Sequence, residues 1–458
     1  MPRAMWTAML TGFSLAAQAG AAATSAIATD HYIDSEMRTQ HIPGIALAVY
    51  KRGRPIYVKS YGVATLEHNV AVQPQTLFQI GSIGKQFTAV AIMLLANEHR
   101  LSLDDPLSKY LPEVPDNWQA VTLRRMLNHQ SGIAQLLDDD HHLLDLRREY
   151  SDLELIRLAA SQRLDFVPGT NSEYSDTAYV LLGIVINRVT GTFYGDYLQT
   201  HVFKPLGMGR TRIISDADII PDRASGYELS ASGALQNQGW VSVSLNRTAD
   251  GSLYSTVLDL GRWDAALYGD AVLAQADLSR MWRVDSFVNG QRPLYNYGYG
   301  WEINSLRGER VIEYDGNWQG FQAAMARYPE RQLTVVVLTN RSLCRTQRLV
   351  HAVAGLFDHH LVPYGVAPHD ADPARTRAFA QQLDEVLAGR NSQAWGPALA
   401  HELKSVGPIR SVTLSEEMVS PGNDARVYRV ELAQMVDYLT VRYSSDGSID
   451  NLQVYREY

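Results

Sequence analysis

The chain has 458 residues, of which 46% are hydrophobic and 20% charged, a composition typical of globular proteins rather than disordered, collagen-like or multi-span membrane proteins. Because single cores stop growing at ~250–300 residues, we expect one large domain and a smaller one. The 41 basic and 49 acidic residues give a net charge of −8 without a basic run, which argues against a nucleic-acid partner.

The first residues have the pattern of an export signal. Arg3 is followed by the apolar stretch 4–17 and by Ala17-Gln18-Ala19, which resembles a cleavage site. The alternative, an amphipathic first helix, has no visible polar face before Asp30. We therefore predict a signal peptide over residues 1–23 and a periplasmic or secreted mature protein. No other segment reaches the ~18 apolar residues of a membrane span, and no cysteine near the start offers a lipid anchor.

Residues 30–362 have the pattern of one domain with strands at both ends. A helix is expected over 30–40, then a hairpin of strands 44–50 and 55–61. Helical periodicity dominates residues 85–270. The later expected elements are strands 297–303, 310–314, 321–328 and 333–339 and a helix over 349–361. This order predicts an α/β fold with one sheet built from both ends of the domain and a large helical insertion.

The last part of the chain predicts a small α+β domain. Residues 363–373 contain three prolines and are expected to be a linker. The domain over 374–458 begins with a helix at 374–387, and four strands follow at 409–415, 426–432, 438–443 and 449–455. It has no cluster of nucleophilic or metal-ligating residues, so we interpret it as an accessory module without chemistry of its own.

Neither a metal nor a cofactor is expected. The single cysteine, Cys344, excludes a Cys-rich metal site and an intrachain disulfide, and a buried thiol is the simplest interpretation. The run Asp138–His142 is the one local cluster of candidate ligands. Consecutive residues rarely converge on one ion, so we interpret that run as a solvated loop.

Ser82 and Lys85 form a candidate nucleophile and its base. If Ser82 opens the helix that residues 87–96 continue, residues three apart share one face, and the Lys85 amine can reach the Ser82 hydroxyl. A serine needs such a base, and a lysine with a lowered pKa can deprotonate whereas an arginine cannot. Only six of the 41 basic residues are Lys, which makes this one notable. The alternative is that Ser82 caps the helix and Lys85 is solvated.

The surroundings of Ser82 resemble the serine β-lactamase-related hydrolases, the family of class C β-lactamases, DD-peptidases, D-aminopeptidases and related carboxylesterases. The resemblance spans roughly residues 40–360. The segments that carry it are 42–44, 78–87, 122–132, 168–170, 181–183, 205–208, 297–301 and 337–340. It implies a β-lactamase/transpeptidase-like antiparallel sheet flanked by helices, with a helical region beside it and the active site in the cleft between them. It also implies an acyl-enzyme at Ser82 without a metal or organic cofactor.

The second family motif is a Tyr followed two residues later by Asn. Tyr174-Ser175-Asp176 fills it, and the neighbouring matched segments favour it over Tyr194-Gly195-Asp196. By resemblance, Tyr174 would relay protons together with Lys85. Asp176 departs from the usual Asn, because an ionised carboxylate cannot donate a hydrogen bond and adds a negative charge.

The third family motif, a Lys or His one residue before Gly, reads Tyr314-Asp315-Gly316-Asn317 here. By resemblance, Gly316 would let substrate approach the strand, and the backbone N–H groups of Ser82 and Asn317 would hold the oxyanion. Tyr314 takes the place of the basic residue, and its alternative role is that of a half-buried strand aromatic. By resemblance, four residues are expected to bind the substrate or the oxyanion: Asp176, Tyr314, Gly316 and Asn317. An arginine from elsewhere in the fold would restore the missing charge.

Both departures make the site more negative, which disfavours carboxylate-bearing substrates. We therefore expect an exported serine hydrolase of esterase or D-aminopeptidase type, acting on small-molecule or peptide substrates. The alternatives are a β-lactamase or DD-peptidase, a catalytically weak penicillin-binding or sensor-type protein, and an enzyme that transfers the acyl group to an alcohol or amine. The sequence leaves the oligomeric state open.

Overall fold

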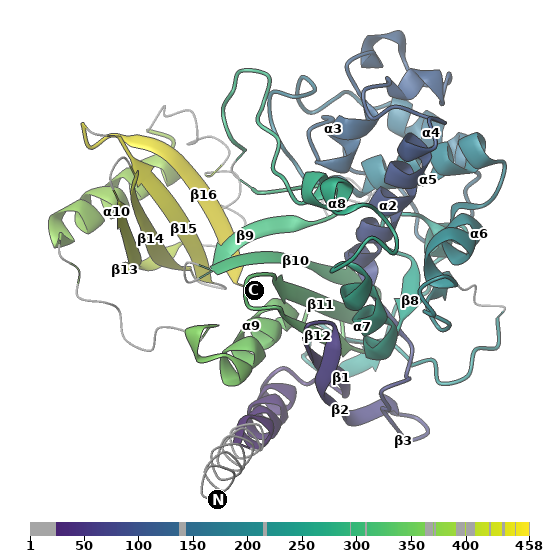
Figure 1. Cartoon of the computed structure of the whole chain (residues 1–458), viewed down its shortest axis with the longest axis horizontal. Helices are drawn as coiled ribbons and strands as arrows, with labels where there is room; N and C mark the ends of the chain where they lie inside the picture. The colour runs from purple at the N-terminus through teal and green to yellow at the C-terminus, as the bar shows by residue number, and fades with distance from the viewer. Residues whose placement is uncertain are drawn as a thin grey trace, which may run out of the picture.

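The computed structural model describes residues 24–136, 143–213, 218–293, 295–306, 309–361, 370, 372–390, 399, 408–420, 423–432, 436–444 and 446–457. At its centre is an antiparallel seven-stranded sheet of order β3-β2-β1-β12-β11-β10-β9 (Figure 1). Its strands are β1 (Gly44–Lys51), β2 (Arg54–Thr65), β3 (Val70–Ala71), β9 (Glu302–Leu306), β10 (Glu309–Trp318), β11 (Phe321–Tyr328) and β12 (Leu333–Thr339). Because β1 pairs with β12, the predicted sheet from both ends of the domain is confirmed.

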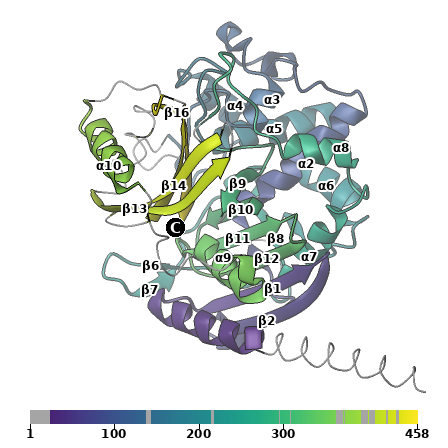
Figure 2. The same ribbon diagram turned by 60° about the vertical axis from the view of Figure 1, so that its left-hand side comes forward.

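Each face of this sheet buries its own apolar core. Strand side chains alternate between faces, so Ala46 and Ala48 of β1 enter the first core while Ile45 and Leu47 enter the second. The first core also contains side chains of α2 (Lys85–Asn97), α5 (Asp176–Thr190) and α7 (Val257–Ala266), of which α7 packs directly on β1 and β12. The second face is covered by α9 (Thr346–Phe357) and by the helix over residues 24–39 (Figure 2). Burial on both faces explains why β1 and β12 are almost continuously apolar.

Helix α2 lies between the sheet and the helical region. Ten of its 13 residues are buried, and Phe87 packs against both Phe203 and Trp263. The other helices are α3 (Leu123–Leu127), α4 (Asp152–Ala160), α6 (Tyr194–Leu198) and α8 (Gln275–Met281), and the short strands are β4 (Phe78–Gln79), β5 (Arg212–Ile213), β6 (Tyr227–Leu229), β7 (Leu235–Asn237) and β8 (Leu253–Ser255). The first residues of α2 are therefore held from two sides.

The C-terminal part forms a separate small sheet domain, as predicted. Its elements are α10 (Pro373–Leu387), β13 (Ile409–Ser420), β14 (Asn423–Leu432), β15 (Val436–Tyr443) and β16 (Ile449–Glu457), and the strands follow one another as an antiparallel meander. Phe379 of α10 stacks on Tyr428, with ring centroids 4.4 Å apart, inside a core of its own. Tyr295 of the larger domain packs against this core.

One predicted strand is displaced. Residues 297–301 form a turn, and the strand begins only at Glu302. The cause is Gly300, which has a positive φ of 72° and where a side chain would meet the Lys85 carbonyl oxygen at 2.6 Å. The segment thus passes directly over the start of α2. The predicted signal peptide and most of the predicted linker lie outside the described residues. In the described part, no helix is long and apolar enough to span a membrane.

Candidate active site

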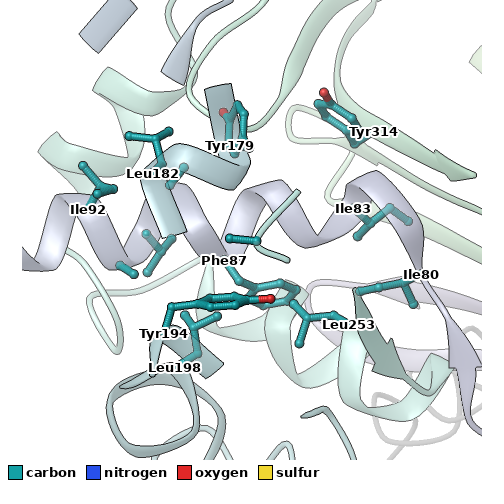
Figure 3. Close-up of a cluster of buried hydrophobic side chains, with 14 of the residues drawn as sticks. Ile80, Ile83, Phe87, Ile92, Tyr179, Leu182, Tyr194, Leu198, Leu253 and Tyr314 are labelled. Carbon is teal, nitrogen blue, oxygen red and sulfur yellow. The ribbon is translucent and has the colours of Figure 1, made fainter. Parts of the chain in front are cut away.

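Ser82 lies in the 3₁₀ turn Gly81–Gly84, which leads directly into α2. The side chains of Ile80, Ile83 and Phe87 are buried around this turn and hold it in place, whereas Ser82 is only half-buried (Figure 3). The Lys85 Nζ atom is 3.0 Å from the Ser82 Oγ atom. The three-residue spacing therefore brings the two groups into hydrogen-bond contact, as predicted.

Strand β10 packs tightly against this turn. A methyl group on Gly316 would lie 2.8 Å from the Ser82 amide nitrogen, and one on Gly81 would lie 2.7 Å from the Asn317 amide nitrogen. Only glycine allows this approach at both positions, and Gly81 also has a positive φ of 53°. The backbone amides of Ser82 and Asn317 are thus near each other, which is the arrangement an oxyanion hole requires.

Lys85 is completely buried and fully hydrogen-bonded. Its ammonium group donates to the Ser82 hydroxyl, to the Asp176 Oδ1 atom at 2.5 Å and to the Asp250 carbonyl oxygen at 2.7 Å. An ammonium group has three N–H donors, so each of them has an acceptor. The ring of Tyr174 lies 4.8 Å from the same nitrogen. The alternative of a solvated Lys85 is therefore wrong.

Tyr174 connects the serine to the carboxylate. Its hydroxyl is 2.6 Å from the Ser82 Oγ atom and 2.9 Å from the Asp176 Oδ1 atom. Burial and the Asp176 charge raise the pKa of Tyr174 well above its usual value, so the phenol stays protonated. Burial alone would raise the pKa of Asp176, but the Lys85 ammonium outweighs it and lowers that pKa, so the carboxylate is ionised.

Gln135, which no sequence pattern identified, orients Asp176. The Gln135 Oε1 atom accepts hydrogen bonds from the backbone N–H groups of Asp176 and Thr177, at 2.8 and 3.2 Å. These bonds direct its Nε2 atom to donate to the Asp176 Oδ2 atom at 3.2 Å. The environment thus suits a carboxylate, which accepts on both oxygens, better than an amide. No spacing in the sequence marks Gln135.

The buried His129 ring packs against the Tyr174 ring. Its Nδ1 atom accepts from the Ser175 backbone N–H at 3.1 Å, and its ring centroid lies 4.7 Å from that of Tyr174. Burial, and then the Lys85 charge, lower the pKa of His129 to about 3, so the ring is neutral. The signal for His129 was present, because it lies in the matched segment 122–132.

The Tyr314 side chain is buried in the apolar core next to the site and is not exposed to solvent there. It is 2% exposed, shares the apolar cluster of Ile83 and has no hydrogen-bond partner for its hydroxyl in the described part of the chain (Figure 3). This corrects the expectation of substrate contact there, because almost none of its surface is accessible. Among the described residues, Lys85 is the only cation that hydrogen-bonds or ion-pairs with Ser82, Tyr174 or Asp176.

A second carboxyl group, that of Asp250, lies close to the single cation of the site. Asp250 lies beside Lys85, and burial, followed by the Asp176 charge, raises the pKa of its carboxyl group to about 6. The site therefore has two carboxyl groups, those of Asp176 and Asp250, beside the single cation Lys85. Sequence patterns did not identify Asp250, which joins the site through a carbonyl oxygen 165 residues from Lys85.

Comparison with known proteins agrees with this geometry. The family described as Beta-lactamase matches residues 29–352. Penicillin-binding protein 4* of Bacillus subtilis is 29% identical over 336 residues, which cover 70% of this chain and 73% of that protein. Protein flp of Staphylococcus aureus is 27% identical over 315 residues, which cover 68% of this chain and 62% of that protein. The chain therefore belongs to the beta-lactamase family.

Solved structures show the same fold. The octameric penicillin-binding protein homologue from Pyrococcus abyssi superposes with a TM-score of 0.62 at 25% identity, covering 92% of this chain and 94% of that one. A D-stereospecific amidohydrolase from Streptomyces superposes with a TM-score of 0.59 at 25% identity, covering 68% of this chain and 93% of that one. The predicted fold class, and the likeness to serine β-lactamase-related hydrolases, are confirmed.

Proposed function

We propose that the chain is a serine hydrolase that cleaves esters or amides through an acyl-enzyme at Ser82, with neutral or amine-bearing substrates preferred over carboxylate-bearing ones. The observation that carries this proposal is the continuous path of hydrogen bonds from Ser82 through Tyr174 to Asp176. It ends at an ionised acceptor and begins at a half-buried hydroxyl, which is what nucleophilic attack requires.

The bonds of Lys85 set the direction of this path. Because Lys85 donates to the Ser82 oxygen, the Ser82 hydrogen is free to point at Tyr174, and the Tyr174 hydrogen at Asp176. As the Ser82 oxygen bonds to the carbonyl carbon, its proton passes to Tyr174 while Tyr174 gives its own to Asp176. The reverse transfer protonates the leaving group when its bond to carbon breaks. A water molecule then attacks the acyl-enzyme by the same route.

The developing oxyanion would be held by the backbone N–H groups of Ser82 and Asn317. Lys85 keeps the carboxylate and the serine oxygen aligned and balances the charge of Asp176. Gly316 lets β10 approach the turn that carries Ser82, which brings the Asn317 N–H near the Ser82 N–H. Asp176 thus serves the proton path, which differs from the substrate-binding role that the sequence suggested.

The ionised Asp176 carboxylate at the site supports the substrate preference. An anionic substrate would meet the Asp176 carboxylate, whose side chain is 23% exposed, whereas the nearby cation, Lys85, is buried and already has three acceptors. The likeness to a D-stereospecific amidohydrolase supports amide substrates among the candidates. The likeness to penicillin-binding proteins keeps β-lactams and D-peptides as the second candidate class.

Steady-state hydrolysis of p-nitrophenyl butyrate tests this proposal. The wild type should turn over the ester, Ser82→Ala should lose all turnover, and Ser232→Ala, a matched change at an exposed serine, should retain it. Undiminished turnover by Ser82→Ala would remove the nucleophile from Ser82. A kcat/KM for nitrocefin, which carries a carboxylate, above that for the ester would overturn the substrate preference. A burst without turnover would instead favour the sensor-type alternative.

We further propose that residues 1–23 direct export and are then removed. The support is the charged start, the apolar stretch and the small-residue pattern in the sequence. N-terminal sequencing of protein recovered from periplasm and medium should find a chain that starts near residue 24. Retention of Met1 in the cytoplasmic fraction alone would contradict export.

A further inference from the structure

A second hollow lies outside the Ser82 site, beside helices α3 and α8. Its volume is about 860 Å³, and none of Ser82, Lys85 and Tyr174 lines it. Four arginines and two amide side chains line it: Arg124, Arg125, Arg280, Arg283, Asn128 and Gln130. A chain of net charge −8 thus gathers four guanidinium groups around one cavity.

The nearby carboxylates balance only half of these charges. Arg124 binds Asp104 through two hydrogen bonds, and Arg283 pairs with Asp285 at 3.3 Å. Among the described residues, Arg125 and Arg280 have no ion pair, although Arg280 helps to lower the pKa of Asp104. Four guanidinium groups against two carboxylates leave two positive charges facing the hollow.

In the described part of the chain, the side chains of Arg125 and Arg280 use few of their hydrogen-bond donors. The Arg125 guanidinium donates to the Ala120 carbonyl oxygen at 2.8 Å and lies against Gly169, where a methyl group would be 2.9 Å from its central carbon. Both arginines are half-buried. A guanidinium group has five N–H donors in a planar fork that suits phosphate and carboxylate oxygens, so most of the donors of Arg125 remain available.

The hollow shares a wall with the site of Ser82. Residues 128–130 turn His129 toward Tyr174, whereas Asn128 and Gln130 line the hollow. The Gln130 Nε2 atom donates to the Asp285 carbonyl oxygen at 2.9 Å, which fixes the opposite side of the cavity to this segment. The cavity is therefore built on the same short segment that supports the tyrosine.

We propose that this hollow binds a small ligand that carries two or more phosphate or carboxylate groups. Two uncompensated guanidinium groups match two oxyanion groups, and the volume exceeds what a single inorganic ion needs. Charge-assisted hydrogen bonds from arginine provide most of the affinity. The inference is independent of the reaction at Ser82.

Titration calorimetry of the full chain with pyrophosphate, citrate and acetate at constant ionic strength tests the site. We expect pyrophosphate or citrate to bind with a Kd below about 1 mM and at least about tenfold more tightly than acetate. The reason is that the binding free energies of two oxyanion groups on one molecule add. Tighter pyrophosphate binding assigns phosphate ligands and tighter citrate binding assigns carboxylates. The absence of binding by both polyvalent probes would overturn the proposal.

Paired variants locate the binding. Arg125→Gln with Arg280→Gln should weaken the better probe by at least about tenfold, because two charge-assisted contacts are lost. Arg280→Gln alone, which removes no hydrogen bond of the described fold, should weaken it by a smaller factor and keep the thermal unfolding midpoint. Arg38→Gln with Arg345→Gln removes the same total charge from exposed positions and should leave affinity unchanged. Equal affinity in the two double variants would overturn the site.

Discussion

Two buried ion pairs lie on the same face of the central sheet, and they differ in access to solvent. Lys85 and Asp176 are 2.5 Å apart, with 0% and 23% of their side chains exposed. Arg327 of β11 and Asp264 of α7 are 2.7 Å apart, with 2% and 0% exposed. The first pair joins α2 to α5 and the second joins β11 to α7, so burial of opposite charges by itself does not mark a site.

The partners of each pair separate their roles. Around Lys85 the other acceptors are a half-buried serine hydroxyl and a carbonyl oxygen, and the carboxylate continues into Tyr174. The Arg327 side chain is instead enclosed by the rings of Tyr268 and Trp282, 5.0 and 5.2 Å from its central carbon. The Lys85 pair contacts the Ser82 hydroxyl, which is the proposed nucleophile, whereas the Arg327 pair is enclosed in the interior. A buried ion pair therefore indicates a candidate site only where it also contacts a group that is exposed to solvent.

The same substitution in both pairs should give opposite results, and the largest effect is expected at the site. Lys85→Met removes the donor to Ser82 and the charge that balances Asp176. We expect kcat/KM for p-nitrophenyl butyrate to fall about 10⁴-fold, or roughly 5 kcal/mol. Because Asp176 is partly solvated and can take up a proton, the free energy of unfolding should fall by less than about 2 kcal/mol. More than a tenth of the wild-type activity would contradict this role.

Arg327→Met should instead damage stability. It leaves Asp264 buried and unpaired, so the free energy of unfolding in urea, followed by tryptophan fluorescence, should fall by about 3–5 kcal/mol. The kcat/KM of the folded protein should stay within about threefold of the wild type. Adding Asp264→Leu should restore much of the lost stability, because the orphaned charge is removed. A loss of activity without a loss of stability would reverse the comparison.

A smaller, pH-dependent effect on the free energy of unfolding is expected at Asp250, which contacts Lys85. Its pKa of about 6 in the folded chain lies above the usual value of 3.8, so the unfolded chain loses this proton first as pH rises. The ionised group thus lowers the free energy of unfolding between about pH 4 and 6. In Asp250→Asn, the change in that free energy from pH 4.5 to 7 should be about 2 kcal/mol more favourable than in the wild type. The exposed Asp34→Asn should follow the wild-type curve.

The smallest effect is a change of specificity. Asp176→Asn removes one negative charge near the substrate, so the ratio of kcat/KM for nitrocefin to that for p-nitrophenyl butyrate should rise about tenfold. Both rates should also fall, since the amide cannot accept the Tyr174 proton. The exposed Asp116→Asn serves as the control and should leave the ratio unchanged. An unchanged ratio in Asp176→Asn would show that charge at this position does not select substrates.

Local patterns were sufficient for the strands and for the first contact of the site. The predicted strands 321–328 and 333–339 have the bounds of β11 and β12, because a short and almost continuously apolar run is a property of adjacent residues. Ser82 and Lys85 meet because they are three residues apart at the start of α2. Tyr174 and Asp176 were found through the resemblance of flanking segments rather than through spacing.

The sequence by itself determined most of the elements, the contact between Ser82 and Lys85 and the family resemblance, since each depends on neighbours in the chain. Only the tertiary structure decided that Gln135 meets Asp176 across 41 residues, and that the Asp250 carbonyl oxygen meets Lys85 across 165. It also decided that Tyr314 is buried and that residues 297–301 turn over α2. Such contacts follow from the path of the whole chain, because distant backbone segments must pack before their polar groups can pair.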